Sequence, residues 1–394
     1  MAVSTTEPGR PGRLDLRLHL VGQHPDHLLA RRARRGAARL RRVGQGRAAV
    51  AVRPESGPRG LSRSSAPRGS ARHGVNAVPR PGFVIGVDFG GTKVAVASAT
   101  LLGTIVKHVR FDTEAAHGAE QAVHRAGEAC RAIISETEAD THGPCLAAGI
   151  VCPGIVLRNR IALAPNVPGW EDLRLQEAMQ EELELAAIAV ENDVKAAGLA
   201  EARWGSLSGC DPAVFLSLGT GVAASVLVGG QVLAGAHGAA GELGYSLCGS
   251  AQGRAFAAGR APLEEFAGGR FIGIRATRML KRNMTAADAF AATDEAVSEL
   301  VDGALDELAV HVANMAIILD PQRIAVGGGL MGSAGRVLAA LGRQLKSAVP
   351  FPPSLVRASF LHDAALRGAI ALALDLPAAR SEGMAELATG HRRG

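Results

Sequence analysis

The chain of 394 residues is 47% hydrophobic and 20% charged, so it is long and apolar enough for two buried cores and is not a disordered protein. Its formal net charge of +6 comes from residues 1–82, which hold 17 Arg, no Lys and four acids, and the remainder is acidic. Because binding to phosphate backbones depends on clustered Lys and Arg, we expect no nucleic-acid partner for the remainder.

The cysteines and the hydropathy pattern restrict the compartment. The five cysteines are scattered and never form a C-x-x-C pair, which argues against a disulfide framework and a cysteine-rich metal site. No apolar run reaches the roughly 18 to 20 residues that a membrane-spanning helix needs, and the N-terminus lacks the order of a signal peptide. We therefore expect a cytoplasmic protein that does not insert into membranes.

Residues 1–82 are rich in Arg, Pro, Gly and Ser, a composition typical of disorder. They do not show the two amphipathic helices around a tight turn that a DNA-binding helix-turn-helix requires. The absence of Lys beside 17 Arg also fits translated upstream sequence from a GC-rich genome, with the true start near Val75 or Val78. The alternatives to this start-site artefact are a solvated tail and a nucleic-acid-binding arm.

From Phe83 onward the sequence alternates between apolar runs and turns. An apolar run at 83–88, a turn at 90–92 and a second apolar run at 93–99 predict a β-hairpin. The other elements expected in this part are buried strands at 146–151 and 186–191 and an amphipathic helix at 194–204.

Residues 214–232 repeat the opening design, with a strand, a Gly-Thr-Gly turn and a second strand, which implies two lobes of related architecture. The longest helical pattern, at 297–319, is followed by a strand at 323–326 and three glycines. The expected parts are an N-terminal lobe at 83–193, a C-terminal lobe at 194–363, a C-terminal helix at 364–378 packing back on the N-terminal lobe, and a tail at 379–394.

The strongest local motif runs from Asp88 to Lys93. Gly90 and Gly91 let the backbone approach a phosphate without a Cβ in the way, and Thr92 and Lys93 can donate to its oxygens. Asp88, at the end of a buried strand, can hold Mg²⁺ through water. The alternative is a plain β-turn in which glycine supplies positive φ and Asp is its usual partner.

Two further glycine turns follow apolar strands. Like the first motif, the turn Gly219-Thr220-Gly221 ends a strand with small residues whose backbone N–H groups and hydroxyl can face a phosphate. A nucleotide that is bound between two lobes needs such a second phosphate loop. The third turn, Gly327-Gly328-Gly329, lets a nucleoside lie flat on backbone. Taken alone, the Gly-Thr-Gly turn is a weak signal, and the third turn is more often a tight connection between a strand and a helix.

The candidate catalytic residue is Asp193, in the tripeptide Glu191-Asn192-Asp193 at a strand end before a helix. Phosphoryl transfer needs one carboxylate oriented to take the proton of the attacking hydroxyl. The alternative is helix capping, because Asn and Asp are favoured N-caps. Glu242 and the pair Glu264-Glu265 follow on separate segments, and paired carboxylates can accept hydrogen bonds from vicinal sugar hydroxyls. The alternative for Glu264 and Glu265 is a surface charge on a helix, which fits one of the two.

These motifs, in this order and together with Ala164-Pro165-Asn166-Val167-Pro168-Gly169-Trp170, closely resemble the ROK family of bacterial sugar kinases, transcriptional repressors and uncharacterised reading frames. The resemblance covers about 83–376. It implies an α/β, two-lobed actin-like ATPase (ribonuclease H-like) fold and ATP-dependent, Mg²⁺-requiring phosphorylation of a hexose hydroxyl, glucose or a close relative. The alternative is a sugar-sensing regulator that has lost turnover. Homodimerisation is implied by the resemblance only.

The resemblance also assigns roles to individual residues. It makes Asp193 the base, Asn192, Glu242 and Glu264 sugar ligands, and Asn166 with Gly154 part of the pocket wall. In the family a structural zinc is held by a histidine after G-E-x-G and by three cysteines in C-x-C-G-x-x-G-C spacing. Here Tyr245 takes the histidine position and the following stretch offers Cys248 alone, so we expect this zinc to be absent. Because that histidine also approaches the sugar, Tyr245 is a candidate substrate-binding residue.

Overall fold

The computed structural model describes residues 82–390 except 159, 165–167 and 250–254. The extension before Gly82 and the pocket-wall candidate Asn166 therefore lie outside the described residues. Within the described part no helix is both long and apolar enough to cross a membrane.

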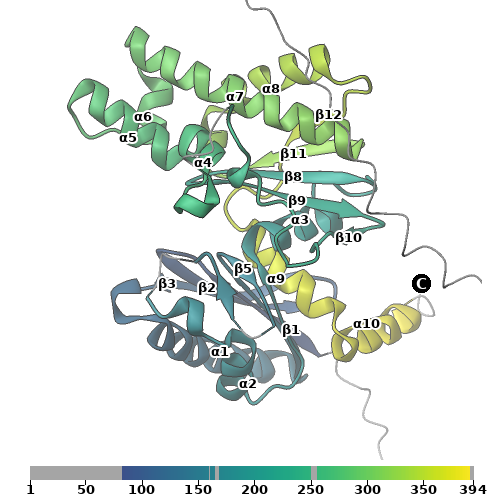
Figure 1. Ribbon diagram of the computed structural model, residues 1–394. Coiled ribbons are helices and arrows are strands. Elements are labelled where there is room, and N and C mark those ends of the chain that lie inside the picture. Colours follow the sequence, from purple (N-terminus) through teal and green to yellow (C-terminus); the bar gives the residue numbers. More distant parts are fainter. Residues whose placement is uncertain (1–81, 159, 165–167, 250–254, 391–394) are drawn as a thin grey trace, which may run out of the picture. The chain divides into compact units, whose positions relative to one another are not determined.

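The first sheet has the strand order β3-β2-β1-β4-β7 (Figure 1). β1, β2 and β3 form an antiparallel meander, whereas β4 and β7 add in parallel on the other side of β1. The hairpin expected at 83–99 is confirmed by the β1–β2 pair. The strand bounds are Phe83–Phe89 (β1), Lys93–Thr100 (β2), Ile105–Asp112 (β3), Cys145–Cys152 (β4) and Ile188–Asn192 (β7).

Helices cover both faces of this sheet. Because β1 and β4 are therefore buried on both sides, their sequences are nearly continuous apolar runs. The side chains on one face pack with α1 (Ala119–Thr141) and α2 (Leu175–Leu183), around the buried Trp170 and Phe89. The other face packs against α9 (Ala364–Asp375), which contacts β1 and β4.

The second sheet has the order β10-β9-β8-β11-β12, and its strands repeat the directions of the first sheet. The repeated order and directions confirm the expected pair of related lobes and the α/β actin-like fold. The strand bounds are Ala213–Leu218 (β8), Val222–Val228 (β9), Gln231–Val232 (β10), Arg323–Gly327 (β11) and Ser354–Arg357 (β12), and a separate pair consists of Ile155–Val156 (β5) and Ile161–Ala162 (β6).

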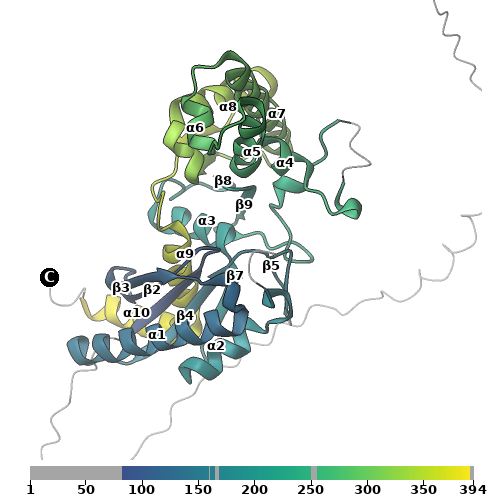
Figure 2. The same ribbon diagram turned by 90° about the vertical axis from the view of Figure 1, so that its left-hand side faces the viewer.

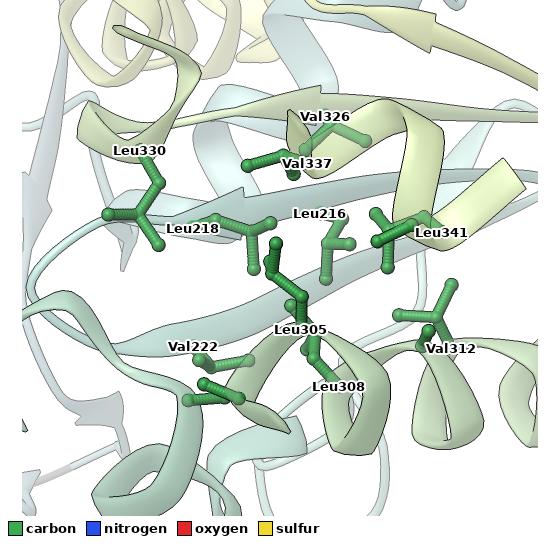
Figure 3. Close-up of a cluster of buried hydrophobic side chains, with 14 of the residues drawn as sticks. Leu216, Leu218, Val222, Leu305, Leu308, Val312, Val326, Leu330, Val337 and Leu341 are labelled. Atoms are coloured by element: carbon green, nitrogen blue, oxygen red, sulfur yellow. The ribbon is translucent and has the colours of Figure 1, made fainter. Parts of the chain in front are cut away.

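The core of the second lobe lies between its sheet and two long helices, α7 (Glu295–Leu319) and α8 (Ala334–Ala348). Figure 3 shows leucines and valines of β8, β9 and β11 meeting Leu305, Leu308 and Val312 of α7. The side chain of Asp294 caps α7 by accepting from the Val297 N–H. Smaller helices complete this lobe: α4 (Pro262–Ala267), α5 (Gly269–Leu280) and α6 (Ala286–Ala291).

The opposite face of the second sheet packs against α3 (Asp193–Trp204), whose other side meets α9. Figures 1 and 2 both show α3 and α9 side by side. Close approach requires small residues, because a Cβ on Gly368 of α9 would lie 2.7 Å from the Ala196 Cβ of α3. Short 3-10 helices lie at Ala115–His117, Trp170–Asp172, Leu243–Tyr245 (η3), Phe256–Ala258 and Gly329–Ser333.

The C-terminal end differs from the sequence expectation. α9 ends at Asp375, and a further helix, α10, spans Pro377–Gly390 where we expected only a tail. The physical reason is that Pro377 cannot continue α9 but suits the first turn of a new helix. α9 packs on β1 and β4, and the division of the chain into the expected parts stays a prediction.

Candidate active site

Asp193 stands at the start of α3, directly after the carboxyl end of β7. The preceding residue, Asn192, caps the helix, because its Oδ1 accepts from the N–H groups of Val194 (2.9 Å) and Lys195 (3.0 Å). The Asn192 Nδ2 donates to the carbonyl of Gly154 (2.9 Å). The capping alternative therefore holds for Asn192, while the Asp193 carboxylate accepts from the Val194 N–H (2.9 Å).

Asp88 and Asp193 come from strands on either side of β4, whose carboxyl ends lie at the same edge of the sheet. Burial, followed by the charge of Asp193, raises the pKa of Asp88 to about 7, against a lowering by Arg110. Burial raises the pKa of Asp193 to about 6. Within the described residues the Asp88 carboxylate makes no hydrogen bond or ion pair. The two carboxylates thus form an acidic pair that a cation would stabilise.

The first glycine turn is held by its own backbone and by Thr113. The Gly90 N–H donates to the Lys93 carbonyl (2.9 Å), and Thr113 Oγ1 donates to the Gly90 carbonyl (2.7 Å). Gly91, Thr92 and Lys93 are exposed, so their donors are accessible to a ligand.

The second and third glycine turns meet at one cavity of about 1010 Å³. Gly219, Thr220 and Gly329 line this cavity. The second turn is held by a hydrogen bond to another element, because its Gly219 carbonyl accepts from the Gly269 N–H (3.0 Å) at the start of α5. Gly328 has φ 88°, and a Cβ there would lie 2.6 Å from the Leu218 carbonyl carbon. Gly221, Gly327 and Gly328 do not line the cavity.

Sequence reasoning missed the rest of the cavity wall, which comes from α5, α6, the turn between them and the 3-10 helix that follows the third glycine turn. Its polar residues are Arg270, Thr277, Arg278, Asn283, Thr285 and Ser333. The signal that was available is the glycine pair before Arg270, which lets α5 begin against the second glycine turn: the N–H groups of Gly269 and Arg270 donate to the carbonyls of Gly219 (3.0 Å) and Thr220 (3.1 Å).

The candidate sugar ligands Glu242, Glu264 and Tyr245 act on one another electrostatically, and Glu242 is also affected by Asp193. Burial raises the pKa of Glu242, and the charges of Asp193 and Glu264 raise it further. Burial also raises the pKa of Tyr245, with the charges of Glu242 and Glu264 contributing. Such mutual effects require short separations between these groups. The structure therefore brings together residues that lie far apart in the sequence.

Glu264 and Tyr245 are each held by a neighbouring residue. Glu264 Oε2 accepts from the Val222 N–H (3.2 Å), next to the second glycine turn. The Tyr245 ring meets Phe256 edge-on, with ring centroids 5.6 Å apart. Glu265, by contrast, accepts from Arg260 Nε (2.6 Å) and belongs to a different ion pair. Of the two adjacent glutamates, Glu264 is the one that joins the candidate site.

Lys195 is a further residue that the sequence did not single out. It is 2% exposed, its Nζ donates to the Gly238 carbonyl, and its charge lowers the pKa of Glu242. A buried lysine one helical turn into α3 is costly unless it is paired. Its position fixes a positive charge close to the carboxylate of Glu242.

The geometry can be compared with known proteins. The sequence profile of the ROK family matches residues 84–376. The chain belongs to the ROK family. Its relatives include an N-acetylmannosamine kinase of Escherichia fergusonii, 31% identical over 73% of this chain and 97% of the relative, and a glucokinase of Halalkalibacterium halodurans, 28% identical over 65% and 83%.

Solved structures of ROK proteins share the fold. A ROK hexokinase from Thermus thermophilus has a TM-score of 0.64 at 28% identity and covers 74% of this chain and 97% of its own. A ROK family glucokinase from Streptomyces griseus, in complex with glucose and AMPPNP, has a TM-score of 0.59 at 25% identity, covering 74% and 99%. A ROK family transcriptional regulator homologous to the E. coli MLC protein has a TM-score of 0.66 at 20% identity, covering 77% and 80%, which is a likeness of fold alone.

Proposed function

We propose that this ROK protein transfers the γ-phosphate of ATP to a hydroxyl of a hexose, glucose or a close relative, with Asp193 as the general base. The observation that carries the proposal is the placement of Asp193: it stands at the start of α3, where burial raises its pKa, its charge raises the pKa of Glu242, and it makes no ion pair among the described residues. The sugar kinases among its relatives, and the glucose and AMPPNP bound by the Streptomyces griseus enzyme, support the same reaction.

The acidic groups have separate tasks in this proposal. Glu242 and Glu264 accept hydrogen bonds from vicinal hydroxyls and fix the sugar, and the Tyr245 phenol can donate to a hydroxyl. The Asn192 side chain is fixed by its hydrogen bonds to the Val194 N–H and to the Gly154 carbonyl, so it can contact the sugar without changing its conformation. Asp193 then takes the proton of the attacking hydroxyl, for which a pKa of about 6 suits a base at neutral pH.

The glycine turns bind the nucleotide. The cavity of about 1010 Å³ is large enough for a nucleoside, with Phe290 and Ile274 as apolar walls and Arg270 and Arg278 as charges. Gly219 and Thr220 at its edge direct the phosphates, and the exposed donors of Thr92 and Lys93 meet them from the other lobe.

Magnesium fits the residues present. The partly buried Asp88 carboxylate, with a raised pKa and no hydrogen-bond or ion-pair partner among the described residues, offers the oxygen ligand that Mg²⁺ prefers. When bound, Mg²⁺ supplies charge neutralisation on the phosphates. Asp88 then holds the cation at the carboxyl edge of the first sheet, and Asp193 faces the sugar.

The test is ADP release by the purified chain with ATP, Mg²⁺ and a panel of hexoses and amino- or N-acetyl-hexosamines. We expect one sugar or a few related sugars to stimulate ADP release well above the sugar-free rate. Sugar binding by calorimetry without any ADP release would contradict the kinase proposal and favour the sugar-sensing regulator. A gel-shift assay of the full chain against a truncation lacking residues 1–82 then shows whether the Arg-rich extension binds DNA.

The pH dependence of turnover follows from the raised pKa of Asp193. The base must be deprotonated, so kcat/KM is expected to rise about tenfold per pH unit below pH 6 and to level off above it. The measurement is the initial rate between pH 4.5 and 8.5, with circular dichroism confirming the fold at each end. If kcat/KM instead levelled off above about pH 4, the pKa of an ordinary carboxyl, the result would contradict the raised pKa of Asp193.

Gly221→Ala tests the coupling of the second glycine turn to the sugar site. A Cβ on Gly221 would overlap Glu264 Oε2 and lie 2.8 Å from its Cδ. The carboxylate must move, so we expect the KM of the sugar to rise roughly tenfold, the loss of about one hydrogen bond to a charged group, while the KM of ATP changes less. Gly335→Ala is the control, because Gly335, like Gly221, does not have a positive φ, and no atom lies within 4 Å of its added Cβ. Equal changes in both KM values would contradict the assignment of Glu264.

A further inference from the structure

Three potential metal ligands meet at a place that the proposed reaction does not use. Glu307 and His311 lie four residues apart on α7, so both project from the same face of the helix. Cys248 reaches them from the segment after η3. One ligand atom from each residue lies within 4.8 Å of the other two.

The separations match those between ligands of one small cation. Zinc bonds of about 2.0–2.1 Å to nitrogen, about 2.0 Å to oxygen and about 2.3 Å to sulfur, at tetrahedral angles, place nitrogen roughly 3.3 Å from oxygen and roughly 3.6 Å from sulfur. In the structure His311 Nε2 lies 3.3 Å from Glu307 Oε1 and 3.9 Å from Cys248 Sγ. The first distance equals the tetrahedral value, and the second exceeds it by about 0.3 Å.

The chemistry of the three groups selects the cation. Thiolate and imidazole together favour zinc and similar transition metals over Mg²⁺ and Ca²⁺, which prefer oxygen ligands. An ordinary helix pair would account for Glu307 with His311, but not for a sulfur on the same ring nitrogen. The His311 side chain is 14% exposed and Glu307 33%, so the cluster is sheltered yet open to a water as the fourth ligand.

We propose that Cys248, Glu307 and His311 form a binding site for Zn²⁺ or a similar divalent transition metal. Two of its ligands come from α7 and lie outside the zinc motif that the family resemblance implies, so the expected absence of that motif's site is compatible with this one. The bound metal joins α7 to the segment after η3, the 3-10 helix that carries Tyr245 and follows Glu242. It is therefore a structural clamp behind the candidate sugar site, and it stands independently of the proposed reaction.

The experiment uses Co²⁺ as a spectroscopic probe on the untagged full chain after treatment with a chelator. We expect one equivalent of Co²⁺ per chain to produce the visible bands of tetrahedral cobalt and a near-ultraviolet thiolate charge-transfer band, and Zn²⁺ to displace it. At a hundredfold excess over its Kd, Zn²⁺ should raise the Tm by roughly 5 °C. No saturable Co²⁺ binding, or a spectrum without the thiolate band, overturns the site.

Variants identify the ligands. Cys248→Ser should remove the thiolate band, and Cys248→Ser, Glu307→Gln and His311→Gln should each weaken Co²⁺ binding at least tenfold. Cys210→Ser, at another partly exposed cysteine, and Glu299→Gln, at an exposed glutamate of α7, are the matched controls and should bind as the wild type does. A thiolate band that survives Cys248→Ser overturns the proposal; if that variant does not fold, the two α7 variants decide, and unchanged affinity in both overturns it.

Discussion

Asp193→Asn is expected to lower kcat by roughly 10²–10⁴-fold while leaving the fold and the affinity for ATP nearly unchanged. Asn keeps the oxygen that accepts from the Val194 N–H and remains a good residue at a helix start, so α3 should form as before. What is lost is the basic oxygen for the sugar proton. The measurement is steady-state ADP release with saturating ATP and sugar, together with the Tm of the variant.

The matched control for Asp193→Asn is Asp306→Asn, which removes a carboxylate at an exposed position of α7. We expect its kcat to stay within about twofold of the wild type, since exposed charges distant from a site are screened. If Asp193→Asn retained most of the wild-type kcat, the general-base role would be wrong and another group would have to accept the proton. A large fall in Tm for Asp193→Asn would instead make Asp193 a structural residue.

Much of the fold was predictable because its elements carry local signals. Each hairpin joins two apolar runs through a short glycine-containing turn, so β1–β2 and β8–β9 could be recognised separately and then matched to each other. The long apolar periodicity at 297–319 marked α7 within two residues of its start. α10 was not predicted, because its apolar residues lack a strong helical periodicity and because Pro377, two residues after the end of α9, interrupts the helical pattern.

The candidate site was predictable only where motif and position coincide. Asp88 and Asp193 each follow a buried strand, and the topology alone brings these two strand ends to one edge of the sheet. The approach of Glu242 and Glu264 to Asp193 was expected from the resemblance, since no local pattern relates segments so far apart. Lys195 and the wall of the nucleotide cavity were missed because burial and cavity shape arise from tertiary packing, which periodicity does not report.

Electrostatic effects link acidic residues of the candidate site that lie far apart in the sequence. The charge of Asp193 raises the pKa of both Asp88 and Glu242, while Arg110 lowers the first and Lys195 lowers the second. A cluster of acidic groups reduces the stability of the fold unless ligands or cations neutralise it. The proposed sugar, nucleotide and divalent cation would provide this neutralisation.

The largest expected effect on stability is at Gly149, in the middle of β4 and directly under α9. A Cβ at this position would overlap the Ala369 carbonyl oxygen and lie 2.8 Å from its carbonyl carbon. Both obstacles are helix backbone, which cannot rotate away as a side chain can. Gly149→Ala must push α9 off the sheet, and we expect it to reduce the free energy of unfolding by about 3 kcal/mol, the upper end of overpacking costs.

Urea denaturation followed by circular dichroism measures this loss, and Gly303→Ala provides the matched control. Gly303 lies in α7 with no atom within 4 Å of an added Cβ, so the same change should there stabilise the helix by about 0.5–1 kcal/mol. The opposite signs separate the packing of β4 against α9 from the general effect of replacing glycine. A Gly149→Ala protein as stable as the wild type would mean that α9 does not pack closely against β4. The position of α9 on the first sheet would then have to be revised.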